Sequence, residues 1–163
     1  PFASAADVNA ILKATTGKVT ATVTASTDAE ALIKDLKDAK ATDALTLVVT
    51  GTATAAELKA LDAKTSVTVD ASGITTIAGN AADVKTVLAA TTIDRAADVI
   101  VNVSGTVSAA DANTIAKATG GDVTATVAAG TAASLVKALE NVTTNSDALT
   151  LRNRGINGIL RFK

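Results

Sequence analysis

Hydrophobic and polar residues alternate in several short segments of the chain. In residues 19–24, Val19, Ala21 and Val23 alternate with three threonines. Strict alternation is typical of a strand with one buried face and one solvated face. The same pattern predicts six strands, at residues 19–24, 45–50, 67–71, 99–104, 123–128 and 149–152.

Each predicted strand is preceded by a segment with apolar residues three or four positions apart, which predicts a helix. The predicted buried positions are Val8, Ile11, Leu12, Leu32, Ile33, Leu36, Leu58, Leu61, Val84, Val87, Leu88, Leu135, Val136 and Leu139. A phrase such as S-A-A-D or T-A-A-E opens most of these segments, and its first side chain can cap the helix start while the acid follows three residues later. The predicted helix starts are Ser4, Thr27, Thr54, Asn80, Ser108 and Thr131.

These starts are 23 to 28 residues apart, so the chain is a tandem repeat of six units of about 26 residues. A second level of repetition is also present. Residues 4–47 and 108–151 align without gaps at an offset of 104, with 23 identities in 44 positions. Four units therefore form a longer repeat, of which this chain holds about one and a half. We expect the chain to be a fragment of a larger array.

The predicted fold is a right-handed α/β solenoid of six helix–strand units, with one parallel sheet and helices on one face only. The alternative is a doubly wound, flavodoxin-like α/β domain. Strands of that class are buried on both faces and are continuously apolar, whereas these strands alternate. The stretch at 71–79 is longer than the equivalent turns, and Ile74 and Ile77 are expected to tuck under the sheet or form an extra strand.

We predict a single solenoid domain at residues 1–151 and an atypical basic tail at 152–163. The tail departs from the repeat and carries four basic residues and no acid, at Arg152, Arg154, Arg161 and Lys163. Two interpretations are open. The tail is either a cap, whose apolar side chains cover the last repeat unit, or a non-native sequence that is out of frame.

Composition narrows the function classes. The chain has 37 Ala and 27 Thr and no His, Cys, Met, Trp or Tyr. Disulfides, imidazole or thiolate metal sites and His-dependent nucleophilic catalysis are therefore excluded. The net charge of −1 combines a tail of +4 with a body of −5, which argues against nucleic-acid binding. No apolar run approaches the length of a membrane span. We predict no enzyme activity, no catalytic residue, no metal site and no cofactor.

Some carboxylates lie close together in the sequence. Asp35 and Asp38 are three positions apart, and Asp94 and Asp98 are four apart, but interleaved lysines favour a solvated surface. For calcium, the best candidates are Asp70, Asp94 and Asp98. No calcium-loop motif contains them.

Threonines are regularly placed on the predicted solvated face of the sheet. The candidate binding face consists of Thr20, Thr22, Thr46, Thr68, Thr124, Thr126 and Thr150. We expect one column of Thr20, Thr46, Thr68, Ile100, Thr124 and Thr150, and a second of Thr22, Val48, Asp70, Asn102, Thr126 and Arg152. Such a face suits a protein or glycan ligand. Ice is a weaker candidate because Asp70, Asn102 and Arg152 break the second column. Threonine is also simply a good exposed strand residue.

The low-complexity Ala, Thr, Val and Asp repeats of residues 4–151, without Cys or His, resemble the repeat regions of very large secreted or cell-surface proteins of bacteria, cyanobacteria in particular. The resemblance implies a spacer, adhesin or surface-layer-like role at the cell surface or outside the cell. Its expected partners are the neighbouring repeats of the parent protein.

Overall fold

The computed structural model describes residues 2–139, 147–153 and 156–161, and it divides into two compact subdomains. The N-terminal subdomain contains Pro1–Thr75 and Ala90–Ala96, and the C-terminal subdomain contains Thr76–Ala89 and Ala97–Lys163. One long strand, β4 (Val69–Asn80), contributes its first half to the former and its second half to the latter. The fold is mixed α/β with a mostly parallel sheet.

The N-terminal subdomain alternates helices with short parallel strands. Its other elements are α1 (Ala5–Ala14), β1 (Thr20–Thr22), α2 (Ala29–Asp35), β2 (Ala44–Thr46), β3 (Val48–Thr54), α3 (Ala55–Asp62) and β5 (Ile93–Arg95). Strand β1 pairs with β2, β3 is the neighbour of β4, and β4 pairs with β5. The core contains fully buried leucines from both layers, such as Leu36 of the helical layer and Leu45 of β2.

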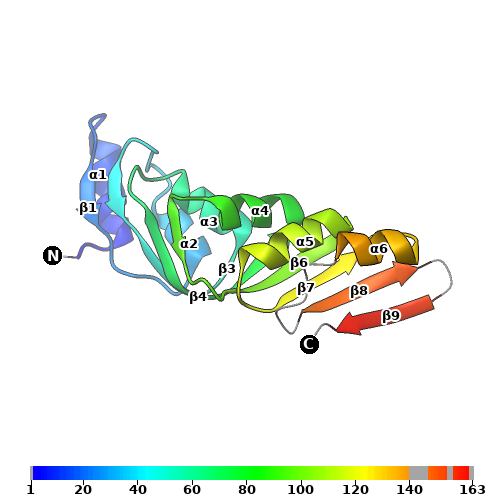
Figure 1. Ribbon diagram of the computed structural model, residues 1–163. Helices are drawn as coiled ribbons and strands as arrows, with labels where there is room; N and C mark the ends of the chain where they lie inside the picture. The colour runs from blue at the N-terminus through cyan, green and yellow to red at the C-terminus, as the bar shows by residue number, and fades with distance from the viewer. Residues whose placement is uncertain (1, 140–146, 154–155, 162–163) are drawn as a thin grey trace. The chain divides into compact units, whose positions relative to one another are not determined.

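The C-terminal subdomain repeats the pattern with longer strands. Besides the second half of β4, its elements are α4 (Ala81–Ala89), β6 (Ile100–Val107), α5 (Ala109–Ala118), β7 (Val123–Val127), α6 (Ala132–Ala138), β8 (Ala148–Asn153) and β9 (Ile156–Arg161). Strands β4, β6, β7 and β8 pair in parallel in chain order. Helices α4, α5 and α6 lie on one side of them (Figure 1). A doubly wound sheet would instead reverse its strand order and carry helices on both faces.

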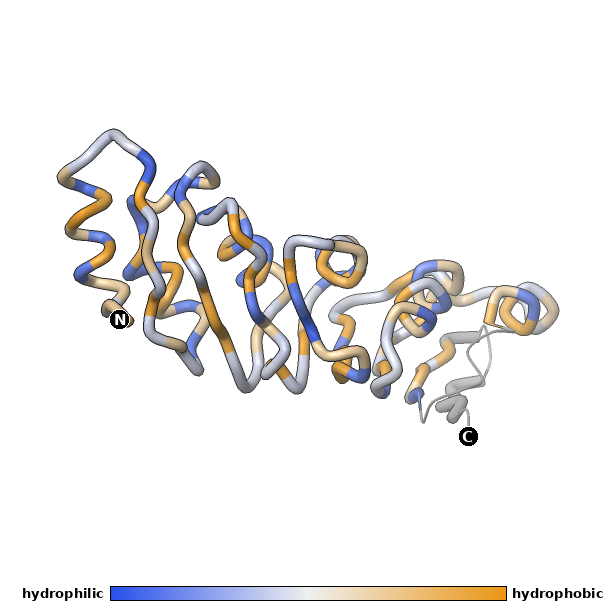
Figure 2. The backbone as a smooth tube through the Cα atoms, turned by 60° about the vertical axis from the view of Figure 1, so that its left-hand side comes forward, coloured by the Kyte–Doolittle hydropathy of each residue, from blue (hydrophilic) through white to orange (hydrophobic). Residues whose placement is uncertain are grey.

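Burial follows the predicted alternation along most strands. In β6, Val101 and Val103 are buried, whereas Ile100 and Asn102 are exposed. Hydrophobic and hydrophilic positions alternate along the tube in the same way (Figure 2). Val67 is an exception, because it was expected to face inward and is 37% exposed. The strand begins only at Val69, so Val67 lies in the preceding turn and is not held by the sheet.

The stretch after residue 71 continues the strand without interruption. Strand β4 runs for 12 residues, and both Ile74 and Ile77 are buried in it. Strand β5 was not predicted. It has only three residues, and a pattern of period two cannot be recognised in so short a segment.

Five of the six predicted helix starts form their N-cap hydrogen bonds, and the remaining helix is capped one residue later than predicted. Ser4, Thr54, Asn80, Ser108 and Thr131 each accept the backbone N–H three residues later. The second cap is Asp28, not Thr27, because the Asp28 carboxylate accepts the N–H of Ala31 at 2.8 Å.

The buried stripe of the helices is narrower than predicted. Ile11 is 54% exposed and Val136 is 72% exposed, although both were expected to be buried. Their neighbours Leu12 and Leu135 are buried. In α1 and α6 the buried stripe is therefore narrower than predicted, whereas α4 buries all three predicted residues, Val84, Val87 and Leu88.

The described part of the tail forms a strand that differs in direction from the rest. Strand β9 pairs antiparallel with β8, with Leu149 opposite Leu160 and Arg152 opposite Asn157. The pairs β1–β2, β4–β5, β4–β6, β6–β7 and β7–β8 are all parallel. The departure of the tail from the repeat sequence is thus accompanied by a departure in topology.

Candidate binding face and coupling contacts

The seven threonines of the candidate binding face occupy the solvated side of their own subdomains. Thr20, Thr46, Thr68 and Thr124 are exposed, and Thr22, Thr126 and Thr150 are half-buried. Thr68 precedes the first residue of β4, whereas the other six lie in strands.

The columns expected from the sequence are wrong in register. Thr22 stands beside Thr46, and Thr20 stands beside Ala44. In the C-terminal subdomain, Thr124 stands between Asn102 and Ala148 instead of beside Ile100 and Thr150.

The error has a simple cause. The predicted columns matched positions counted from the start of each predicted strand, but the observed register is set by inward-facing pairs such as Val101 with Val123. A shift of two residues keeps every side chain on its own face, so the alternation alone cannot detect it.

The structure adds a threonine that the sequence reasoning missed. Thr106 stands beside Thr126, which in turn stands beside Thr150, so three threonines form one row across β6, β7 and β8. The strand β6 was expected to end at Ser104. The register of β6 and β7 shifts between Asn102 and Thr106, where Gly105 adopts a φ of 76°. This irregularity lets the strand continue, and the glycine after the predicted strand is the signal for it.

Two buried aspartates join backbone segments that are far apart in the sequence. Asp43 is 2% exposed, and its carboxylate accepts the N–H of Val19 and the N–H of Lys40, both at 2.9 Å. Asp147 is 1% exposed and accepts the N–H of Val123 at 2.8 Å. The two sites are 104 positions apart and belong to the repeated phrase D-A-L-T-L. The repetition of this phrase is the sequence signal for the two sites.

Two buried threonines play a similar part. The Thr65 hydroxyl donates to the carbonyl of Leu45 at 2.7 Å, and the N–H of Leu45 donates to it at 3.0 Å. The Thr119 hydroxyl donates to the carbonyl of Val99 at 2.5 Å. We call side-chain hydrogen bonds and ion pairs between residues 20 to 29 positions apart coupling contacts. The coupling contacts of the buried aspartates and threonines satisfy backbone groups where the regular strand ladder begins.

Neighbouring helices of the N-terminal subdomain are also coupled. Asn9 of α1 exchanges two hydrogen bonds with Asp38, which follows α2, and both are 2.9 Å long. The Lys64 ammonium, after α3, donates at 2.8 Å to the carbonyl of Leu36 at the end of α2. A cation at a helix C-terminus is favourable for the exposed carbonyls there. Partial burial lowers the pKa of Lys64, and the negative charge of Asp38 opposes that shift.

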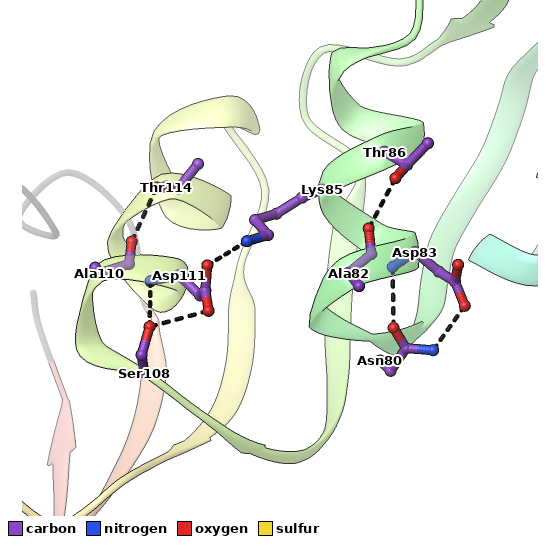
Figure 3. Close-up of polar contacts among 9 residues, drawn as sticks. All are labelled: Asn80, Ala82, Asp83, Lys85, Thr86, Ser108, Ala110, Asp111 and Thr114. Carbon is purple, nitrogen blue, oxygen red and sulfur yellow. Dashed lines mark hydrogen bonds and ion pairs between the residues drawn. The ribbon is translucent and has the colours of Figure 1, made fainter.

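In the C-terminal subdomain, an ion pair joins two helices. The Lys85 ammonium on α4 contacts the carboxylate of Asp111 on α5, which also accepts from the Ser108 hydroxyl at 2.9 Å (Figure 3). Both hydrogen bonds favour the charged form, so they hold the pKa of Asp111 below its usual value, with Lys85 the larger cause.

The structure brings two of the candidate carboxylates together, because Asp70 of β4 stands beside Asp94 of β5. Asp35, Asp94 and Asp98 are exposed, and Asp38 is engaged by Asn9. Asp70 accepts the hydroxyl of Ser72 at 2.6 Å and its N–H at 3.0 Å, which lowers the pKa of Asp70. Among the described residues, no group of three or more acidic side chains is placed to hold a metal ion.

In the described part of the chain, none of the helices is both long and apolar enough to cross a membrane. No protein-family model, no curated protein and no solved structure matches the chain.

Proposed function

We propose that the chain is a non-enzymatic structural module, built by stacking successive helix–strand units as a segment of a larger secreted or cell-surface array. The observation that carries this proposal is the strand register. The parallel strand pairs of known register join residues 20 to 24 positions apart, from Thr20 with Ala44 to Thr124 with Ala148. A chain that returns beside itself after each short interval is the defining property of a solenoid.

The number of repeat units and the handedness of their connections are part of the same proposal. We infer six helix–strand units in one right-handed α/β solenoid. Right-handed crossovers are the rule for parallel strands, and the six capped helices recur at nearly the sequence period. The buried aspartates support the proposal, because Asp43 and Asp147 each tie one segment to another 24 positions away. Hydrogen bonds of this kind hold successive repeat units together.

A second candidate function is a binding module that uses the threonine face. The row of Thr106, Thr126 and Thr150 is the observation that favours it, because it presents three hydroxyls on adjacent strands. Hydroxyls both donate and accept, which suits the hydroxyl groups of a glycan or the polar side chains of a protein. The row shows no charged side chain that would fix a ligand.

A ligand screen separates the two functions. The intact chain is tested against a glycan array and a panel of extracellular-matrix and cell-surface proteins, beside a variant with Thr22→Lys, Thr124→Lys and Thr126→Lys. The structural proposal predicts no saturable binding by either protein. Saturable binding by the intact chain that the triple variant loses would replace it with the binding function. A second variant, with Lys at the exposed helix positions Ala31, Ala56 and Ala82, controls for the three added charges.

A further inference from the structure

We propose that the face of the chain formed by Asp7, Ile11, Thr15 and Gly17 is a docking surface for a further repeat unit with the chemistry of residues 80–107. This inference rests on the proposed function and names the contacts by which the array continues. Residues 108–122 carry the same groups 104 positions later, and within the C-terminal subdomain they contact Lys85 of α4 and residues 97–99 of the preceding unit.

Residues 108–122, which we call the docked face, show how a preceding unit is held. Asp111 binds Lys85 of α4, and the Thr119 hydroxyl donates to the carbonyl of Val99. The N–H of Gly120 donates to the carbonyl of Ala97 at 2.7 Å. Ile115 is completely buried.

Gly121 makes the closest approach on this face. A Cβ atom at Gly121 would lie 2.2 Å from the carbonyl oxygen of Asp98 and 2.5 Å from that of Val99. Real side chains do not approach backbone oxygens so closely, so only glycine fits when the preceding unit is in place. The requirement comes from the neighbouring backbone, because φ at Gly121 is not in the left-handed region.

Residues 4–17 are identical to residues 108–121 at ten of 14 positions, with Thr16 in place of Gly120, and the two segments share their local geometry. The helix caps agree closely, with φ and ψ of −67° and 151° at Ser4 against −69° and 153° at Ser108. At the other helix end, Thr15 has −134° and 150°, and Thr119 has −133° and 148°. Thr15 accepts the N–H of Gly17 at 3.1 Å, as Thr119 accepts that of Gly121 at 3.0 Å.

The two faces differ in what covers them. Ile11 is 54% exposed, whereas its equivalent Ile115 is 0% exposed. Thr15 is exposed, whereas Thr119 is 6% exposed. A Cβ at Gly17 would meet only the Thr15 hydroxyl, at 3.4 Å. The N-terminal face therefore resembles the face at residues 108–122, but no preceding unit among the described residues covers it.

The matching geometry identifies the occupant. It is a helix–strand unit that carries a lysine where α4 has Lys85, apolar side chains against Ile11, and strand-end carbonyls for Thr15. A second copy of this chain does not supply that surface, because its own residues 80–107 are already covered by its residues 108–127. The occupant is thus a preceding unit on the same polypeptide.

The test adds this unit to the existing chain. A copy of residues 76–107 is fused directly before Ser4, so that it precedes residue 4 as it now precedes residue 108. Gly17→Ala and Ile11→Ala are then introduced into both the original and the extended chain. Gly121→Ala in each chain is the matched control, because its site is already docked.

The proposal predicts that Gly17→Ala leaves the melting temperature of the original chain within about 2 °C and lowers that of the extended chain by about 4 °C or more, as Gly121→Ala does in both. Ile11→Ala is expected to behave in the same way. If Gly17→Ala and Ile11→Ala are silent in the extended chain while Gly121→Ala is not, the docking surface is wrong.

A third outcome names a different occupant. Concentration-dependent dimers of the original chain that Gly17→Ala abolishes would assign the face to a second copy and overturn the proposal. These results are independent of the ligand screen. A failure to dock leaves the screen unaffected, and a ligand found in the screen does not change the melting comparison.

Discussion

At the residue scale, the buried aspartates have the clearest energetic role. The N–H of Val19 lies in the interior and has the Asp43 carboxylate as its acceptor. If a buried N–H loses its acceptor, the free energy of removing it from water is no longer offset by a hydrogen bond, and the folded state is destabilised. Neither the strand pattern nor the helix pattern indicates this role, because a lone aspartate before a strand looks like an ordinary turn residue.

We therefore expect Asp43→Ala to lower the free energy of unfolding by roughly 1–3 kcal/mol. Asp43→Asn is expected to cost less, since its side-chain oxygen can still accept from Val19. Urea denaturation followed by circular dichroism measures both. Asp35→Ala, at an exposed position, is the control and is expected to stay within about 0.5 kcal/mol of the original chain. Equal effects at Asp43 and Asp35 would remove the coupling role.

Asp147 gives a prediction about pH. Burial raises the pKa of the Asp147 carboxyl above its usual value, the hydrogen bond from Val123 lowers it in part, and the charge of Asp122 raises it. The folded state therefore binds this proton more tightly than the unfolded state does. The resulting stabilisation is fully present below the unfolded pKa of about 3.9 and is lost as the pH rises through the raised folded pKa.

Asp147→Asn removes this titration while leaving an oxygen to accept from Val123. The difference in unfolding free energy between the original chain and the variant is expected to shift in favour of the original chain as the pH falls from 7 toward about 4. Urea midpoints measured across that range give the difference. A constant difference, or one that moves the other way, would contradict the assigned shift.

At the element scale, the helices are set mainly by their caps. Glu57 accepts the backbone N–H of Thr54 at 2.7 Å and completes a capping box. The aspartates Asp7 and Asp111 instead accept from the serine hydroxyls of Ser4 and Ser108. Glutamate is one methylene longer than aspartate, and at Thr54 that longer side chain spans the distance to the backbone.

Thr54→Ala is expected to destabilise the chain by about 1 kcal/mol, because the N–H of Glu57 loses its acceptor. Thr54→Ser keeps the hydroxyl and serves as the control, with an expected change of less than half that size. Thermal unfolding of the three proteins checks the order. A Thr54→Ser variant as unstable as Thr54→Ala would show that the cap hydrogen bond is not the cause.

Element type was predictable from the sequence, whereas element ends were less so. Period-two and period-3.6 patterns located six helices and most strands, since each pattern reflects one buried face. The failures have local causes. β6 was expected to stop at Ser104 but continues past Gly105, and Ile11 lies on the expected apolar stripe but faces solvent. The sequence pattern shows which side of a helix or strand is apolar. Which apolar residues on that side are buried depends on the segment that packs against them.

At the scale of the whole molecule, the repeat was evident in the sequence but the register was not. A repeat length fixes how often an element recurs. The pairing of two parallel strands is fixed by the inward side chains that pack together, and shifts of two residues leave the alternation unchanged. The threonine columns were misplaced for this reason, although all seven residues kept the solvated side. The coupling contacts at Asp43 and Thr65 required coordinates, because they join residues 20 to 24 positions apart.

The central claim is that successive segments stack in parallel with a separation of 20 to 24 residues. Nuclear Overhauser contacts between backbone protons of adjacent strands test it most directly in the intact, isotope-labelled chain. The account predicts contacts that pair Thr22 with Thr46, Asn102 with Thr124 and Thr126 with Thr150. Contacts that instead pair Thr20 with Thr46 or Thr124 with Thr150, or an antiparallel pattern between β6 and β7, would contradict it.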